Sequence, residues 1–101
     1  LCDALLSPTP GELTFALNRE QLRAGLVVSE EEVREAMRFA FRVLKLVEEP
    51  GGAVALAALL AGHPAADFRR VGVILSGGNV DPALFADVLS AAQYTAGHAS
   101  A

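Results

Sequence analysis

The stretch VGVILSGGNVDP, residues 71–82, joins the pattern of a buried strand to a glycine-rich turn and a helix start. Residues 71–75 are apolar or small and are bounded by turn signals, which is typical of a strand buried on both faces. The next four residues, Ser-Gly-Gly-Asn at 76–79, allow a sharp turn and the close approach of a ligand, because glycine tolerates positive φ and has no Cβ. We therefore expect a binding site at this junction, with the rest of the chain supporting it.

A helix is expected directly after the turn. Asp81 has the side chain of an N-cap and Pro82 suits the first helical position, so the helix should continue over residues 83–89. Its N-terminal amides would point back at the turn, which suits an anion or a polar heterocycle. The small and polar residues 94–101 are expected to form a frayed tail.

Upstream, the pattern predicts a helix from Gly11 that ends at Gly25, followed by a short strand over residues 26–28. A further helix over residues 53–61 is apolar on nearly every side, which predicts burial all around it.

Between these lies a helix that should start at Glu30 and run to about Leu46, because Ser29 and Glu32 have the spacing of a capping box. Its apolar stripe should face the core and its arginines should form an outer, solvated face rather than a partner-binding surface. The stripe consists of Val33, Met37, Ala40 and Leu44, and the arginines are Arg34, Arg38 and Arg42.

Composition limits the classes of function. The 101 residues allow one domain, and 52% hydrophobic residues with a mean hydropathy of +0.39 are rich for a small independent domain, which predicts surface covered by something else. A net charge of −4 with interleaved signs leaves no footprint for nucleic acid, and no run is long and apolar enough to predict a membrane span. The single cysteine, Cys2, excludes an internal disulfide and is compatible with the cytoplasm.

The expected fold class is α/β, with helices packed on a parallel sheet. Two short strands with helices between them leave open edges and uncovered faces, so the sheet needs further strands from elsewhere. Because the chain also starts at Leu1 in mid-pattern, we expect a piece of a longer polypeptide, with residues 1–94 in one domain and 95–101 as tail.

Three motifs carry a resemblance to a known family. The string Val-Ile-Leu-Ser-Gly-Gly-Asn-Val-Asp at 73–81 resembles the C-terminal signature of the pyridoxal-phosphate-dependent serine/threonine dehydratases, which include threonine ammonia-lyases and serine racemases. Residues 44–53, Leu-Lys-Leu-Val-Glu-Glu-Pro-Gly-Gly-Ala, resemble the family's second C-terminal motif, and residues 3–15 resemble the segment that follows its metal-binding loop. The motifs follow in the family's order and cover residues 1 to about 90.

The resemblance implies the C-terminal part of the large domain of a fold-type II enzyme, which converts L-threonine or L-serine to a 2-oxo acid and ammonia. It also implies pyridoxal 5'-phosphate as cofactor, a divalent or monovalent cation in the parent enzyme, and a homodimer. The partners of this piece would be the remainder of the polypeptide and a small amino-acid substrate. The family's Schiff-base lysine, phosphate loop and metal carboxylates belong to upstream motifs, so this segment should hold no catalytic or metal-binding residue and should be inactive alone.

Four residues are implied to lie at the cofactor. Ser76 matches the serine that hydrogen-bonds the pyridine nitrogen, Glu49 matches a carboxylate near the ring, and Gly77 and Gly78 would let the backbone approach the cofactor. The alternative for Ser76 is a serine that only caps the strand end, and for Glu49 a loop carboxylate in water.

Other polar residues have simpler interpretations. Lys45, the only lysine, suits the C-terminal dipole of its helix better than a Schiff base, and Asn79 suits a turn. In some serine racemase-like members, the residues matching these two lie near a nucleotide effector. His63 and His98 are isolated and have no metal-ligand spacing.

Near the N-terminus, Ser7 and Thr9 either touch substrate, as the resemblance implies, or only shape a proline-rich turn. A different class of function also stays open for the whole chain: a non-catalytic α/β module that binds a phosphorylated ligand at the Ser76 turn or serves in assembly.

Overall fold

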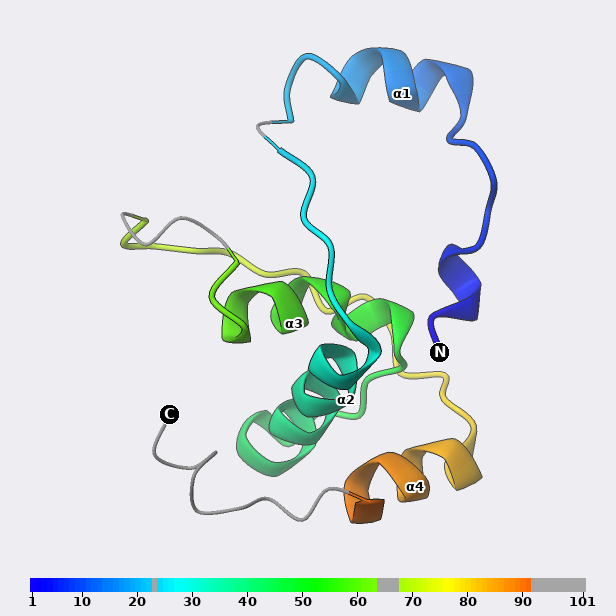
Figure 1. Cartoon of the computed structure of the whole chain (residues 1–101), viewed down its shortest axis with the longest axis vertical. Helices are drawn as coiled ribbons and strands as arrows, with labels where there is room; N and C mark the ends of the chain where they lie inside the picture. The colour runs from blue at the N-terminus through cyan, green and yellow to red at the C-terminus, as the bar shows by residue number, and fades with distance from the viewer. Residues whose placement is uncertain (23, 64–67, 92–101) are drawn as a thin grey trace.

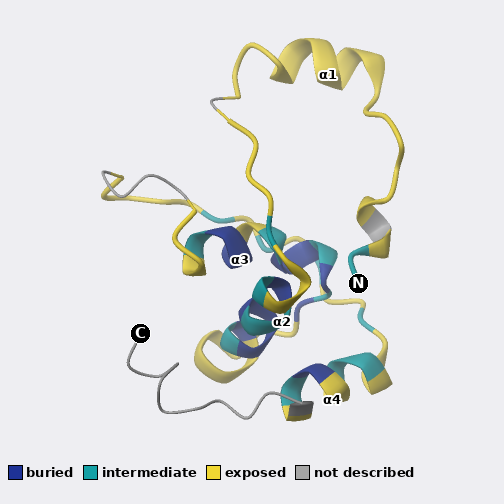
Figure 2. Cartoon of the chain, viewed as in Figure 1, coloured by how far each residue is buried: buried dark blue, intermediate teal, exposed yellow. Residues whose placement is uncertain are grey.

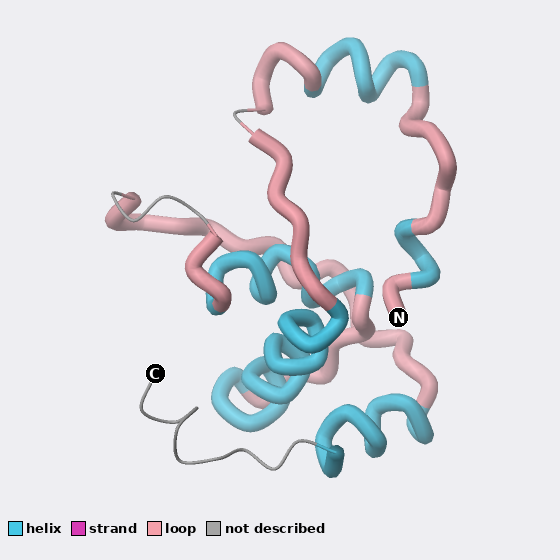
Figure 3. Tube along the Cα trace, viewed as in Figure 1, coloured by secondary structure: helices cyan, strands magenta, loops and turns pink. Residues whose placement is uncertain are grey.

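The computed structural model describes residues 1–22, 24–63 and 68–91, and these residues form helices and loops (Figures 1 and 3). The predicted tail and His98 lie outside the described residues. The elements in chain order are η1 (Asp3–Leu5), α1 (Glu12–Asn18), α2 (Glu30–Phe39), η2 (Ala40–Leu44), η3 (Gly51–Ala53), α3 (Val54–Leu60) and α4 (Pro82–Ala91). None of the helices in this part of the chain has the length and apolarity to cross a bilayer.

The prediction of strands at residues 26–28 and 71–75 is wrong for this chain taken alone. Both segments are loops, and the described residues contain no strand (Figure 3). A strand is defined by its hydrogen-bonded ladder to a neighbour, and here neither segment pairs with the other or with a third. Their sequences favour strands, but the neighbours that would complete a sheet are not among the described residues.

The core forms where α2 packs against α3 on one side and α4 on the other (Figures 1 and 2). Of the predicted stripe, three residues are fully buried, whereas Leu44 is 43% exposed. The buried core cluster consists of Val33, Ala36, Met37, Ala40, Ala53, Leu56, Ala57 and Val88.

Local capping signals place the starts of α2 and α4 as predicted. The Ser29 hydroxyl accepts the Glu32 amide at 3.1 Å while the Glu32 carboxylate accepts the Ser29 amide at 2.8 Å, which confirms the capping box. Pro82 is the first residue of α4, and the Asp81 carboxylate accepts the Leu84 amide at 3.0 Å. Helix α4 therefore begins three residues beyond the Gly-Gly turn, which fixes its N-terminus beside that turn.

Two left-handed residues end the other helices of the core. Lys45 has a φ of 63° at the end of η2, where the helix closes with π-type hydrogen bonds. Gly62 has a φ of 78° after α3, and the His63 amide donates to the Ala58 carbonyl at 3.0 Å, so α3 ends in a Schellman motif.

Of the arginines predicted to form a solvated face, Arg42 is exposed and Arg34 is half-buried, whereas Arg38 does not face solvent. Arg38 is only 1% exposed: its Nη1 donates to the Val88 carbonyl at 3.0 Å, and its Nη2 contacts Glu31 at 2.6 Å and Glu35 at 3.3 Å. Helix α4 covers this side of α2, which a helical-wheel argument on α2 alone cannot anticipate. In addition, Arg42 donates to the Leu89 carbonyl at 3.0 Å and Arg34 pairs with Asp87 at 3.4 Å.

Much apolar surface stays uncovered, as the composition predicted. Helix α1 has no buried residue and lies apart from the core (Figures 1 and 2), and it ends at Asn18, well before the predicted Gly25. Burial of α3 on all sides is also wrong, because Leu60 is 43% exposed. A helix without a packing partner is stabilised only by the weak helix propensity of its own residues, and this explains why α1 is short.

Candidate functional site

The residues predicted to hold the cofactor lie where two loops meet. The Glu49 amide donates to the Gly77 carbonyl at 2.9 Å, which ties the loop before η3 to the Gly-Gly turn. The Val80 amide then donates to the Gly78 carbonyl at 2.9 Å and tightens the turn before α4. Residues about thirty positions apart are thereby brought together as the motifs implied.

Close packing explains three glycines at this junction. A Cβ on Gly52 would lie 2.8 Å from the Gly77 oxygen and 2.9 Å from its nitrogen, both closer than a real Cβ approaches. A Cβ on Gly77 would lie 2.8 Å from Glu49 Oε1, and one on Gly78 would clash with the Val47 carbonyl oxygen. Positive φ is not the reason at 77 and 78, because Gly62 is the one described glycine in that region. The turn requires glycines because the Val47 carbonyl and the Glu49 carboxylate pack directly against it.

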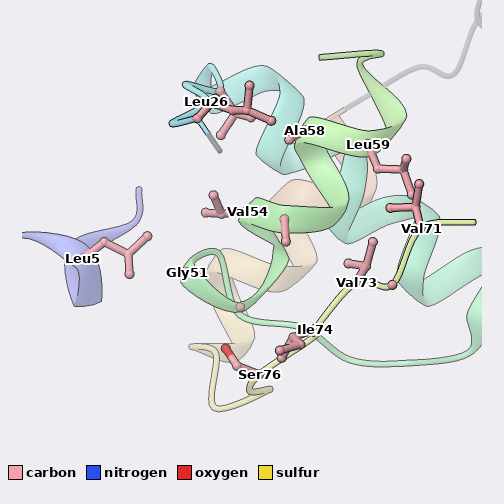
Figure 4. A pocket seen from close by; sticks show the side chains of 15 residues that line it. Leu5, Leu26, Gly51, Val54, Ala58, Leu59, Val71, Val73, Ile74 and Ser76 are labelled. Atoms are coloured by element: carbon pink, nitrogen blue, oxygen red, sulfur yellow. The ribbon is translucent and has the colours of Figure 1, made fainter. Parts of the chain in front are cut away.

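Ser76 is exposed, and its hydroxyl makes no hydrogen bond to the described residues. It lies at one end of a cavity of about 520 Å³ whose wall is mainly apolar (Figure 4). Figure 4 shows that the wall is formed by the segment leading to Ser76, by α3 and by residues nearer the N-terminus. The apolar side chains labelled there are Leu5, Leu26, Val54, Ala58, Leu59, Val71, Val73 and Ile74. An apolar cavity with one free hydroxyl suits a ring that offers a single acceptor.

Glu49 is half-buried and lines a different and smaller hollow, of about 150 Å³, together with Asn79 and Asp81. Its carboxylate lies over Gly77, so it is not simply a loop carboxylate in water. Ser76 and Glu49 are therefore joined through the Gly77 backbone but open onto separate hollows.

Glu48 is a buried group that the sequence reasoning missed. Its side chain is 4% exposed and its Oε1 has no hydrogen-bond partner among the described residues. Burial raises the pKa of the Glu48 carboxyl, and the neighbouring charge of Glu49 raises it further. The available signal was the position of two consecutive carboxylates before Pro-Gly-Gly, since consecutive residues in an extended loop point in opposite directions.

The remaining polar candidates have local roles where they are described. Lys45 Nζ donates to the Arg42 carbonyl at 2.8 Å, which confirms its place at the negative end of the helix. His63 is not isolated, because its Nε2 lies 3.1 Å from Glu32 Oε2. The Ser7 hydroxyl donates to the Thr9 carbonyl at 3.2 Å, which fits the proline-rich turn. The described residues contain no group of three or more histidine, cysteine or acidic side chains arranged to hold a metal.

Comparison with curated proteins gives consistent relatives, although no family model matches the chain. A serine racemase from Dictyostelium discoideum is 36% identical over 92 residues, covering 89% of this chain and 28% of that protein. A phenylserine dehydratase from Ralstonia pickettii is 41% identical over 87 residues, covering 85% and 27%. An L-threonine ammonia-lyase from Thermotoga maritima is 36% identical over 81 residues, covering 80% and 20%.

The chain thus spans about a quarter of the length of the curated relatives it matches. The matches cover most of the chain and include both the Gly-Gly turn and the loop packed on it. By homology, its fold family is that of the fold-type II enzymes. The chain belongs to the pyridoxal-phosphate-dependent serine/threonine dehydratase family.

Proposed function

We propose that these residues are part of a longer lyase that dehydrates and deaminates L-threonine or L-serine to a 2-oxo acid and ammonia. The similar proteins include a phenylserine dehydratase and ammonia-lyases for L-threonine and L-threo-3-hydroxyaspartate. Their substrates share a hydroxyl on the β-carbon, which is the group that such a reaction removes. Matches to serine racemases make a racemase the competing activity within the same family.

The observation that carries this proposal is the free hydroxyl of Ser76 at the end of the apolar cavity. The cofactor of this family contains a pyridine ring with a single nitrogen, so one hydroxyl donor in an apolar wall fits it. In this proposal Ser76 donates a hydrogen bond to that nitrogen, and Gly77 and Gly78 let the backbone lie close to the ring. The packing of Glu49 and Val47 on these glycines would hold the turn rigid.

Pyridoxal phosphate, when bound, supplies the electron sink needed to release the α-proton and then the β-hydroxyl. Ser76 sets how strong that sink is, because a neutral hydroxyl cannot hold the nitrogen protonated as a carboxylate would. A weaker sink favours prompt elimination of the hydroxyl. Glu49 packs on Gly77 and lines a separate hollow, where its charge would orient the turn instead of touching the nitrogen.

The partners follow from the same proposal. The remainder of the polypeptide would supply the Schiff-base lysine, the phosphate loop, any cation site and the strands beside residues 26–28 and 71–75. We also propose a cytoplasmic homodimer that acts on a small amino acid.

The test is an assay of the full-length polypeptide for 2-oxo acid release from L-threonine and L-serine, beside D-serine formation from L-serine. We expect 2-oxo acid as the main product, and a loss of turnover of at least about tenfold for Ser76→Ala. Ser90→Ala is the matched control, because the Ser90 hydroxyl only donates to the Ala86 carbonyl within α4. Absence of 2-oxo acid with both substrates would contradict the proposed activity.

A further inference from the structure

Glu48 is a buried carboxyl for which the proposed function has no use. It lies against Gly52: a Cβ on this glycine would be 3.0 Å from Glu48 Oε1 and 2.8 Å from the Gly77 carbonyl oxygen. Glu48 and the peptide that follows Ser76 therefore approach the same side of Gly52. At 4% exposure, Glu48 is as buried as residues of the hydrophobic core, and its Oε1 has no hydrogen-bond partner among the described residues.

No cation compensates this carboxyl within the described part of the chain. The carboxylates that form ion pairs there are Glu30, Glu31, Glu32, Glu35 and Asp87. The charged group that acts on Glu48 is Glu49, and its effect is repulsive. Gly52, which packs against Glu48 Oε1, carries no charge. Burying an unpaired carboxylate is strongly unfavourable, and taking up a proton removes most of that penalty.

We propose that Glu48 carries a proton in the folded protein and is a positioning residue, whose neutral carboxyl keeps the Gly77 peptide, and with it Ser76, against Gly52. The part that concerns Ser76 rests on the proposed function. A protonated carboxyl can donate to a carbonyl oxygen, and the Gly77 carbonyl approaches the same side of Gly52, whereas a carboxylate would repel both that oxygen and Glu49. Because Gly52 has no Cβ, the Glu48 carboxyl and the Gly77 peptide can both approach it.

This arrangement has a defined pH dependence. Burial raises the pKa of Glu48 above its value in the unfolded chain. The stability that it contributes is therefore fully present below the ordinary pKa of a glutamate, and it is lost as the pH rises through the folded pKa. A glutamine at this position keeps the shape and a hydrogen-bond donor but has no proton to lose.

The experiment compares full-length wild type with Glu48→Gln and with Glu20→Gln, a control at an exposed position. Thermal unfolding is followed between about pH 4.5 and about pH 8, and release of the bound cofactor on dialysis is measured over the same range. We expect the Tm of Glu48→Gln to exceed that of wild type by about 2 °C or more at the upper pH, with a gap that narrows as the pH falls. Cofactor release from wild type should accelerate as the pH rises, and release from Glu48→Gln should not.

Two results would overturn the proposal. A Tm of Glu48→Gln that is equal to or below wild type at every pH would mean an ionised carboxylate, paired with a cation elsewhere in the polypeptide. The expected Tm pattern with identical cofactor release would remove the positioning role. The Tm comparison requires no catalysis, so failure of the lyase assay and failure of this proposal are separate results.

Discussion

At the scale of single residues, the junction is built from backbone and carboxylates packed on glycines. At Gly52, Gly77 and Gly78, an atom of the opposite loop occupies the position that a Cβ would need. The sequence indicated that the glycine turn allows close approach to the backbone, but it could not show which atom lies beside each glycine. The motif predicted that the backbone at Gly77 and Gly78 is closely approached, and the cofactor role of Ser76 stays a prediction. The burial of Glu48 was not predictable, because it depends on the fold of two distant loops.

Gly52→Ala should destabilise the full-length protein by about 1–3 kcal/mol, because a Cβ at that position meets rigid backbone of Gly77 on two sides. Urea unfolding measures the loss directly. Gly25→Ala is the control, since a Cβ on Gly25 meets nothing within 4 Å and should change stability by about 0.5 kcal/mol or less. Equal effects of the two substitutions would show that the packing at Gly52 does not matter.

At the scale of elements, the starts of α2 and α4 followed the local sequence, whereas the end of α1 and the packing partners of the helices did not. The cap at Ser29 and the cap at Asp81 need only three neighbouring residues, so the sequence contained all the necessary information. Residues 26–28 and 71–75 needed a strand beside them, and the buried side of Arg38 needed α4. Strand pairing and the packing of α4 on Arg38 both depend on residues far away in the sequence, so the periodicity of one segment cannot predict them.

Arg38→Ala should cost about 3 kcal/mol, because it removes a buried guanidinium that joins α2 to the Val88 carbonyl and to two carboxylates. Arg34→Ala should cost roughly 1 kcal/mol or less, since its pair with Asp87 is more exposed. Urea unfolding of the two variants in the full-length protein gives the comparison. Costs in the reverse order would contradict the buried position of Arg38.

The start of α2 should weaken in acid. The hydrogen bond from the Ser29 amide, followed by the contact with His63, lowers the pKa of Glu32. The stability that Glu32 contributes is present above the ordinary pKa of a glutamate and is lost as the pH falls through its folded value. Amide hydrogen exchange in the first turn of α2, corrected for the intrinsic rate, should therefore become less protected in acid. Glu32→Gln should lose this dependence, and a wild-type dependence retained in that variant would assign it to another group.

At the scale of the whole molecule, the chain is a small core with large uncovered apolar surfaces. Exposed apolar residues occur on α1, in the loops over residues 26–28 and 71–75, and around the cavity that ends at Ser76; Figure 2 colours α1 as exposed. Such surfaces are expected to be covered by other parts of a protein. The composition predicted this need, and the relatives, about four times as long as the matched segment, agree with it.

Residues 1–101 expressed alone should bind a hydrophobic dye such as anilinonaphthalene sulfonate and release no 2-oxo acid from L-threonine. The uncovered apolar surface explains the dye binding, and the inactivity follows from the proposal that the Schiff-base lysine lies in the remainder of the polypeptide. The full-length protein should bind much less dye per mole. Turnover by the isolated segment would contradict its proposed place as one wall of a larger site.

The most direct test of the central claim is a titration of the full-length protein with pyridoxal phosphate, followed by absorption. Wild type and Ser90→Ala should bind the cofactor with the same affinity, and Ser76→Ala should bind it about tenfold or more weakly, because the ring nitrogen loses its hydrogen-bond donor in an apolar wall. Equal binding by all three, with unchanged absorption of the bound cofactor, would mean that Ser76 does not face the cofactor.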